Sequence, residues 1–286
     1  MWGDLHTHTN FSDGSSDIER LPVLAARTGL DWLAVSDHDS MQSVQYALAH
    51  PVDAGVHLLP AAELTAFDRA RGRRVHLLCY CPRPTGRLQD FCRLMADRRN
   101  AAARRSMAVL EQMYPQFRAQ DAAAFAARSG VVYKTHQMRV LFEAGFTDSI
   151  YGPLYRQLFG RDGPARFDPA YESVETVLDI IRDAGGVAVL AHPSVYNSME
   201  LAAQLAETGA IDGVEIDHPR NSEQDKQVLR GLAARYGLIA TGGSDFHGMH
   251  ASRPVPVGAG RTDGENIRRI LALAGRRGGA VPSGEG

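Results

Sequence analysis

Apolar and polar positions follow two different periods along most of the chain. Short, continuous apolar runs predict buried strands, and segments with apolar residues at every third or fourth position predict helices between them. The predicted strands are 2–8, 31–36, 56–63, 74–80, 187–192, 213–217 and 238–243. The helices predicted around them are 17–30, 41–50, 171–186, 199–209, 222–237 and 265–277.

This pattern changes after residue 81. From 82 to 170 the periodicity is mostly helical, and helices are predicted at 91–113, 121–130 and 135–145. Strands that alternate with helices imply a parallel sheet. We therefore predict an α/β fold, a distorted (β/α)7 TIM-like barrel built from 1–81 and 171–286. Residues 82–170 are predicted to form an inserted helical subdomain, and the tail 278–286 to be disordered.

Composition narrows the class of protein. Hydrophobic residues make up 44% and charged residues 22% of the 286 positions, as in globular proteins. The net charge of −2 gives no overall attraction to nucleic acid. No apolar run is long enough for a membrane span, and no signal peptide is expected, because the chain begins directly in a strand. The cysteines, Cys79, Cys81 and Cys92, are expected to be reduced, which favours the cytoplasm.

Metal-binding types of side chain recur at or just after the ends of the predicted strands. His76, early in its strand, is the exception. Because enzymes on parallel barrels place their sites at the carboxyl ends of the strands, we expect these side chains to converge. Histidine with carboxylate suits zinc, manganese or iron, and the set is too large for one ion. The candidate ligands are His6, His8, Asp13, His38, Glu63, His76, His192, Asp245 and His247.

The segments that carry these residues resemble the PHP family, the polymerase-and-histidinol-phosphatase group of metal-dependent phosphoesterases. The matching motifs are DLHTHTNFSDG, AVSDHDS, AAEL, HLL, AHP and TGGSDFHG, within 1–81 and 171–250. The resemblance implies two or three divalent ions, expected to be Mn²⁺, with Zn²⁺ or Fe²⁺ as alternatives. It assigns His6, His8, Glu63 and Asp245 to one ion, Glu63, His76 and His192 to a second, and Asp13, His38 and His247 to a third.

The insertion resembles one branch of that family, whose members act on nucleotides or short RNA. VVYKTHQMRVLFEAGF matches its Arg-Pro-His segment, but Lys134 and Thr135 replace Arg and Pro, while His136 is retained. Lysine keeps the positive charge and loses the bidentate fork of arginine. His218 is also a candidate proton donor to the leaving oxygen. The candidate substrate-binding residues are Arg99, Lys134, His136, His218 and Arg220.

The resemblance implies a phosphoric monoester hydrolase. We expect it to remove the 3′-phosphate of nucleoside 3′,5′-bisphosphates by attack of a hydroxide that bridges two metal ions. A 5′-3′ exoribonuclease on short RNA is the alternative, and it would need a basic path with aromatic side chains for the bases. The aromatic content of 7% favours small substrates. Histidinol-phosphate phosphatase and a non-catalytic nucleotide sensor are lesser alternatives, and neither a membrane nor an obligatory protein partner is expected.

Overall fold

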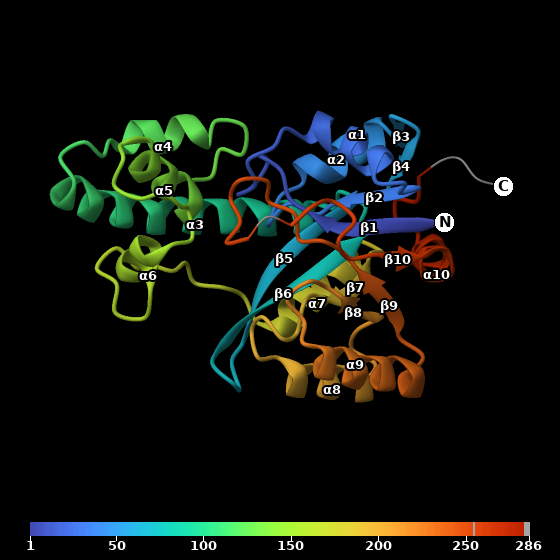
Figure 1. The fold of residues 1–286 in the computed structure, drawn as a ribbon. Helices are drawn as coiled ribbons and strands as arrows, with labels where there is room; N and C mark the ends of the chain where they lie inside the picture. Colours follow the sequence, from blue (N-terminus) through green and yellow to red (C-terminus); the bar gives the residue numbers. More distant parts are fainter. Residues whose placement is uncertain (254, 283–286) are drawn as a thin grey trace.

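The computed structural model describes residues 1–253 and 255–282, and within them the strands form two sheets of five (Figure 1). One sheet contains β1 (Trp2–Thr7), β2 (Trp32–Val35), β3 (Val52–Asp53), β4 (Val56–Leu58) and β10 (Thr262–Asp263), in the order β10-β1-β2-β4-β3. The other contains β5 (Ala61–Asp68), β6 (Arg73–Tyr80), β7 (Val187–Leu190), β8 (Gly213–Asp217) and β9 (Ile239–Gly242), in sequence order.

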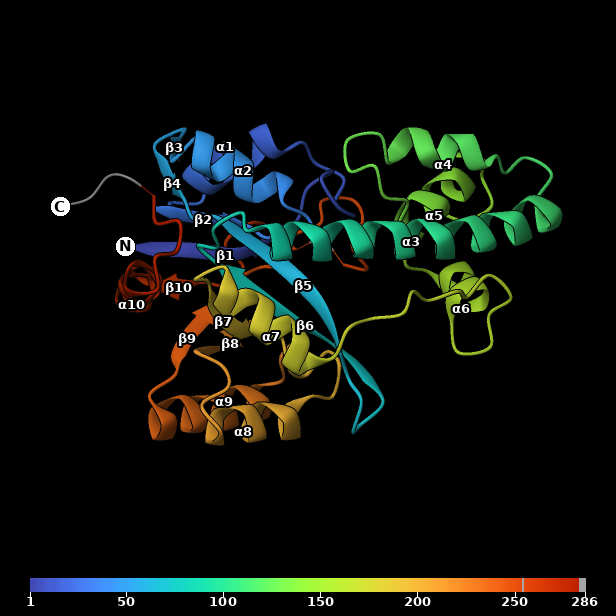
Figure 2. The same cartoon turned by 180° about the vertical axis from the view of Figure 1, so that it is seen from behind.

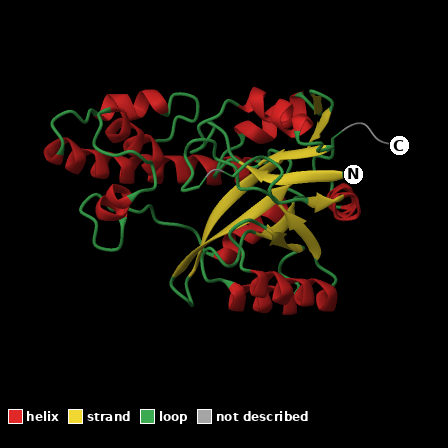
Figure 3. Cartoon of the chain, in the orientation of Figure 1, coloured by secondary structure: helices red, strands yellow, loops and turns green. Residues whose placement is uncertain are grey.

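Helices cover the outside of both sheets (Figure 3). A 3-10 turn (Ile18–Arg20), α1 (Leu21–Arg27) and α2 (Gln42–Ala49) lie beside the first sheet, and α7 (Val174–Asp183), α8 (Met199–Glu207), α9 (Glu223–Tyr236) and α10 (Gly264–Arg276) follow later in the chain. Helix α7 shows why these segments are helical. Its buried residues Val174, Val177, Leu178 and Ile181 recur at helical spacing, and the Ser173 hydroxyl accepts a hydrogen bond from the Thr176 amide.

The direction of β6 differs from the all-parallel prediction. It runs antiparallel to both β5 and β7, whereas β7, β8 and β9 are parallel to one another. The predicted strand 56–63 is also two strands, because the chain crosses from the first sheet to the second at Leu59 and Pro60, and proline cannot donate to a ladder. The early part of β6 therefore lies at the same edge as the carboxyl ends of its neighbours. This explains why His76 sits early in its strand.

The predicted closed barrel is replaced, among the described residues, by two mixed sheets that are joined at both edges. At one edge the amide of Glu63 donates to the Ser36 carbonyl at 3.0 Å. At the other edge the amide of His8 donates to the Phe246 carbonyl at 2.8 Å. Both seams lie beside predicted ligands, so the place where the sheets meet is also the place where the candidate site forms.

The insertion contains four helices within the described chain: α3 (Gly86–Met113), α4 (Ala119–Phe125), α5 (Lys134–Glu143) and α6 (Pro153–Phe159). The first half of α3 packs on the core of the second sheet through residues such as Phe91 and Met95, and its second half joins a separate apolar cluster with α4, α5 and α6. Figure 2 shows that α4, α5, α6 and the second half of α3 form a lobe beside the sheets. None of the described helices combines the length and the apolar character that a membrane span requires.

The prediction that the tail 278–286 is disordered is wrong for its first residues. The Ala280 amide donates to the Cys81 carbonyl at 2.8 Å, and Gly279 approaches the backbone of Cys81 and Gly185 too closely to accept a side chain. The prediction for residues 283–286 lies outside the described residues.

Gly243, at the end of β9, allows the two sheets to approach each other. A Cβ atom there would lie 2.5 Å from the His6 nitrogen and 2.8 Å from its Cα, both of which are backbone atoms. We predict that Gly243→Ala lowers the free energy of unfolding by about 1–3 kcal/mol, because overpacking cannot be relieved by a flexible side chain. Chemical denaturation measures this change.

Gly231 is the matched control, because it lies inside α9 and a Cβ there meets nothing within 4 Å. Gly231→Ala should raise the free energy of unfolding by roughly 0.5–1 kcal/mol through reduced backbone entropy of the unfolded chain. Equal effects of the two substitutions would contradict the close approach of β9 to β1.

Candidate metal centre

The structure brings all nine predicted ligands together at one edge of the sheets. Their ligand atoms fall into overlapping groups, in each of which these atoms lie within 4.8 Å of one another. The groups also include Glu215 and His218, which the sequence prediction did not assign as ligands. The groups are His6, His8 and Asp245; His6, Glu63 and His192; His38, Glu63 and His76; His8, Asp13, His38 and His247; and His6, Glu215 and His218.

Glu63 lies at the middle of this arrangement and is fully buried. Its Oε1 atom is 2.7 Å from His76 Nδ1 and 3.0 Å from His192 Nε2. Its Oε2 atom is 2.9 Å from His38 Nδ1, and 3.3 Å from the Nε2 atoms of both His6 and His8. One carboxylate therefore faces imidazoles from β1, from β6 and from the loops after β1, β2 and β7.

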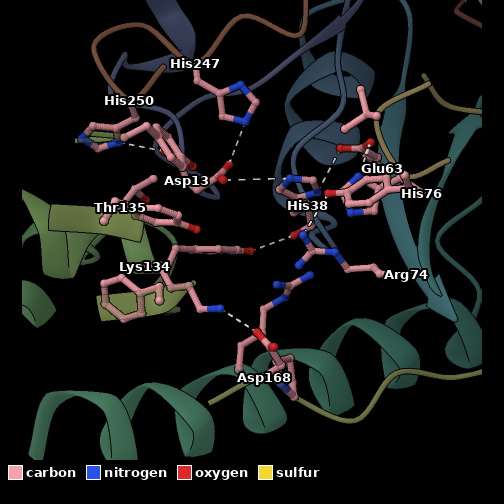
Figure 4. Close-up of a pocket in the computed structure, with 18 of the residues that line it drawn as sticks. Asp13, His38, Glu63, Arg74, His76, Lys134, Thr135, Asp168, His247 and His250 are labelled. Atoms are coloured by element: carbon pink, nitrogen blue, oxygen red, sulfur yellow. Dashed lines mark hydrogen bonds and ion pairs between the residues drawn. The ribbon is translucent and has the colours of Figure 1, made fainter. Parts of the chain in front are cut away.

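A second group lies around Asp13, on the loop after β1. His247 Nε2 is 3.3 Å and His38 Nε2 is 3.9 Å from the two carboxylate oxygens of Asp13 (Figure 4). His38 therefore faces Glu63 with one ring nitrogen and Asp13 with the other. The loop that carries Asp13 is held by Asp37, which accepts hydrogen bonds from the amide of Thr9 and from the hydroxyl of Ser12.

Glu215, in the middle of β8, orients His6. Its Oε1 atom lies 2.9 Å from His6 Nδ1, and its Oε2 atom accepts the His192 amide at 2.8 Å. Since Nδ1 of His6 is occupied in this way, Nε2 faces the centre, where it is 3.5 Å from Asp245. The sequence signal for this role is a single glutamate inside an otherwise apolar buried strand, and the prediction overlooked it.

Two ligand positions have a backbone conformation that is uncommon for residues with a side chain. His192 has a φ of 27° and Asp245 a φ of 53°. Such conformations cost free energy and persist where the surrounding structure imposes them, often at functional sites. Here they direct an imidazole and a carboxylate from strand ends into the centre.

The charges of the centre are strongly coupled. Burial acts to raise the pKa of Glu63, but the imidazoles that surround its carboxylate hold it well below its usual range. Burial acts to lower the pKa of His8, but hydrogen bonds to Asp245 and Glu63 raise it to about 10. The pKa of His6 is likewise raised well above its usual value, against burial, by Glu215, Glu63 and Asp245. Protons on imidazoles thus balance the carboxylates when no metal is bound.

These residues fit divalent cations. Glu63 Oε2, His38 Nδ1 and His8 Nδ1 are buried and have no hydrogen-bond partner of good geometry among the described residues. Burying unpartnered polar atoms is costly, and cations bound beside these atoms would satisfy them. Imidazole and carboxylate donors also match manganese, zinc and iron. The arrangement can therefore hold more than one divalent ion.

A cavity of about 1230 Å³ opens from the centre toward the insertion. Its wall contains Asp13, His38, Glu63, His76 and His192, and on the opposite side residues of α3, α5 and α6. Aromatic side chains are concentrated around the cavity, although they are scarce in the whole chain. They are Phe67, Tyr133, Tyr151, Tyr155, Phe159, Phe167, Tyr171 and Tyr196.

Two predicted substrate-binding cations line the cavity but are already paired. Arg99 donates to Asp39 through Nε at 3.1 Å and to the Thr65 hydroxyl at 2.7 Å. Lys134 Nζ lies 2.6 Å from Asp168, as Figure 4 shows. Both charges are therefore offset by a carboxylate of the protein, which reduces their attraction for a phosphate.

The other three predicted residues differ in position. His136 is not among the residues that line the cavity, and its Nδ1 accepts the Tyr133 amide and so caps α5, so these contacts do not support the predicted phosphate contact. His218 Nε2 is 3.4 Å from Asp245, and burial lowers its pKa, so these contacts favour orientation of Asp245 over proton donation. Arg220 lies at the cavity with its side chain 59% exposed, 3.7 Å from Asp245.

Arg74 is a cavity residue that the sequence prediction missed. It lies on β6 two residues before His76, and residues at that spacing share one face of a strand. Its guanidinium donates to the hydroxyl of Tyr196 at 3.0 Å and faces that of Tyr171 at 3.4 Å. The sequence prediction places Arg74 at the first position of strand 74–80, after a basic turn, and makes no use of its spacing to His76.

Comparison with known proteins agrees with this geometry. The family profile described as PHP domain matches residues 4–189. Phosphoribosyl 1,2-cyclic phosphate 1,2-diphosphodiesterase of Eggerthella lenta is 32% identical, over 89% of this chain and 97% of that protein. The 5′-3′ exoribonuclease Rnm of Escherichia coli is 30% identical, over 85% and 84%. The 3′,5′-nucleoside bisphosphate phosphatase of Chromobacterium violaceum is 27% identical, over 85% and 86%.

A solved structure shares the fold. It is that of a protein from Bifidobacterium adolescentis assigned as a metal-dependent phosphoesterase, with a TM-score of 0.85 and 27% sequence identity. The similarity covers 95% of this chain and 96% of that one. The likeness therefore includes the insertion as well as the two sheets.

The raised pKa values of His6 and His8 predict that metal binding releases protons. The raised pKa values favour a proton on this pair of imidazoles at pH 7 in the metal-free protein, and it must leave before both rings can bind a cation. We expect at least one proton per chain to be released on Mn²⁺ binding, and affinity to rise between pH 6 and pH 8. Titration calorimetry in two buffers with different ionisation enthalpies measures this, and equal observed enthalpies in both would contradict it.

Proposed function

The chain belongs to the PHP domain family, and we propose that it is a metal-dependent phosphatase that removes the 3′-phosphate of nucleoside 3′,5′-bisphosphates. The names of these relatives have in common the hydrolysis of a phosphate ester, so phosphoesterase activity is what they share. The single observation that carries the proposal is a complete set of histidine and carboxylate donors at the end of a cavity that offers further cations and aromatic rings.

We propose that the nine predicted ligands hold two or three divalent ions, with Mn²⁺ first and Zn²⁺ or Fe²⁺ as alternatives. Glu63 is suited to contact two ions, because its two oxygens face different histidines. When bound, such ions would acidify water and offset the negative charge of a phosphoryl group. His76 and His192 would bind the ion at Glu63 Oε1, and His38 would bind the ion at Oε2.

The remaining residues of the centre would fix these donors in position. Glu215 holds His6 with Nε2 toward the centre. His218 accepts the Arg220 amide at Nδ1, so its neutral ring carries the proton on Nε2, beside Asp245. Such partners typically change metal affinity or activity 10–100-fold when removed.

The insertion, residues 82–170, would cap the cavity and contact the nucleoside. Tyr151 and Tyr155 lie with ring centroids 4.8 Å apart, and Tyr155 and Phe159 with centroids 5.4 Å apart, on the cavity wall. Stacking on such rings tolerates any base. Arg220, exposed beside Asp245, is suited to contact a phosphate at the entrance. The three buried free thiols agree with the proposed cytoplasmic location.

A second candidate is a phosphodiesterase of ribose cyclic phosphates or of short RNA. The observation that favours it is the size of the cavity, about 1230 Å³, which exceeds the usual range of pockets for small ligands. The relative with 32% identity is named for a cyclic phosphodiester, and that with 30% identity for an RNA. All of these candidate substrates carry a reacting phosphate on a ribose.

An assay on the Mn²⁺-loaded protein that quantifies both inorganic phosphate and the ribose or nucleotide products tests the proposal, because hydrolysis of a phosphodiester bond releases no inorganic phosphate. The panel is a nucleoside 3′,5′-bisphosphate, the 3′- and 5′-monophosphates, histidinol phosphate, a ribose 1,2-cyclic phosphate with a 5-phosphate, and a short 5′-phosphorylated RNA. We predict that kcat/KM for the bisphosphate exceeds that for either monophosphate at least tenfold.

Two results would contradict the proposed bisphosphate phosphatase activity. Equal kcat/KM on every compound would remove the bisphosphate assignment, and a preference for the cyclic phosphate or the RNA would select the second candidate. The same protein treated with a chelator is the control, and it should form no product from any compound.

A further inference from the structure

The positive charges around the cavity differ in whether the protein already neutralises them. Arg99 is paired with Asp39, and both Lys134 and Arg166 contact Asp168, at 2.6 Å and 3.0 Å. Each of these three cations has a carboxylate partner in direct contact. A phosphate would have to compete with those carboxylates for them.

Arg74 differs because no carboxylate pairs with it among the described residues. Its guanidinium lies 4.9 Å from the ring centre of Tyr196 and 6.0 Å from that of Tyr171. The phenol oxygens of these tyrosines receive its N–H groups. Removing a cation from water without a counter-charge is unfavourable, so this position favours an anion that comes from outside the protein.

The two tyrosines add donors to this position. A phenol oxygen that accepts an N–H still has its own O–H to donate, and no acceptor for either hydroxyl is found in the described part of the chain. Arg74, Tyr171 and Tyr196 therefore offer a guanidinium and two O–H groups at the cavity wall. Phosphate oxygens are the acceptors that such a set binds best.

The position lies one aromatic ring from the metal centre. The ring of Tyr196 is 4.8 Å from that of His76 and 5.6 Å from that of His192, between centroids. Arg74 and His76 are two residues apart on β6, which corresponds to about 7 Å along a strand. Figure 4 shows Arg74 on the side of the cavity that carries His76 and Glu63. An anion at Arg74 would thus lie beside a phosphate at the centre, without sharing its ligands.

We propose that Arg74, with Tyr171 and Tyr196, binds the second, non-reacting phosphate of the substrate and so selects molecules with two phosphates over simple monoesters. This inference rests on the proposed function for the reacting phosphate. It assigns to Arg74 a specificity-determining role, and it leaves Lys134 and Arg99 as residues that support the cavity wall.

Titration calorimetry with the metal-free full-length chain tests the inference without turnover. The ligands are a nucleoside 3′,5′-bisphosphate and the corresponding 5′-monophosphate. Arg74→Gln should weaken bisphosphate binding at least tenfold, and Arg74→Lys should recover part of the loss, because lysine keeps the charge without the fork. In the Mn²⁺-loaded protein, Arg74→Gln should lower the kcat/KM ratio of bisphosphate to monophosphate by a similar factor.

Arg73→Gln is the matched control, because Arg73 is the neighbouring residue on β6, is exposed and does not line the cavity. A Kd for the bisphosphate that differs less than twofold between Arg74→Gln and Arg73→Gln would overturn the inference. If Arg74→Gln does not fold, the double variant Tyr171→Phe/Tyr196→Phe keeps both rings, and it should bind the bisphosphate at least threefold more weakly; an unchanged Kd would overturn the inference. Absence of turnover in the unaltered enzyme would count against the proposed function alone.

Discussion

The structure depends on one buried carboxylate. Glu63 is fully buried, and its two oxygens face five imidazoles at 3.3 Å or less. A carboxylate is buried only at high cost unless positive charge surrounds it. Protonated histidines supply that charge in the metal-free protein, as the raised pKa values of His6 and His8 indicate. Metal ions and protons compete for the same nitrogens, so bound ions would replace these protons in offsetting the buried carboxylate.

The fold brings its elements together at this carboxylate. The Glu63 amide is bonded to Ser36 where the two sheets meet, and the close approach of Gly243 to His6 joins them on the other side. The antiparallel direction of β6 carries both Arg74 and His76 to the same edge. One arrangement of strands therefore produces the sheet seams, the convergence of the candidate ligands and the position of Arg74. The insertion adds aromatic rings opposite the centre. The overall aromatic content of 7% does not indicate this local concentration.

Much of the fold and the candidate site could be predicted from local patterns. Amphipathic helices such as α7 and the strand-end positions of the ligands are encoded in nearby residues, and the nine candidates do converge. The direction of β6 was missed, although a connection as short as 69–72 permits only an antiparallel pair. Glu215 and Arg74 were missed because their roles depend on which neighbours they meet. Conversely, a cation motif cannot show that Lys134 is already paired with Asp168 or that His136 caps a helix.

Metal stoichiometry tests the central claim most directly. The protein is stripped with chelator, loaded with Mn²⁺, freed of excess ion and analysed by inductively coupled plasma mass spectrometry, together with Glu63→Gln. Asp212→Asn is the control, because Asp212 pairs with Arg277, away from the cavity residues. We predict two to three ions per chain for the unaltered protein and the control, and at most one for Glu63→Gln. Fewer than two ions in the unaltered protein, or full occupancy in Glu63→Gln, would contradict a multi-ion centre organised by this carboxylate.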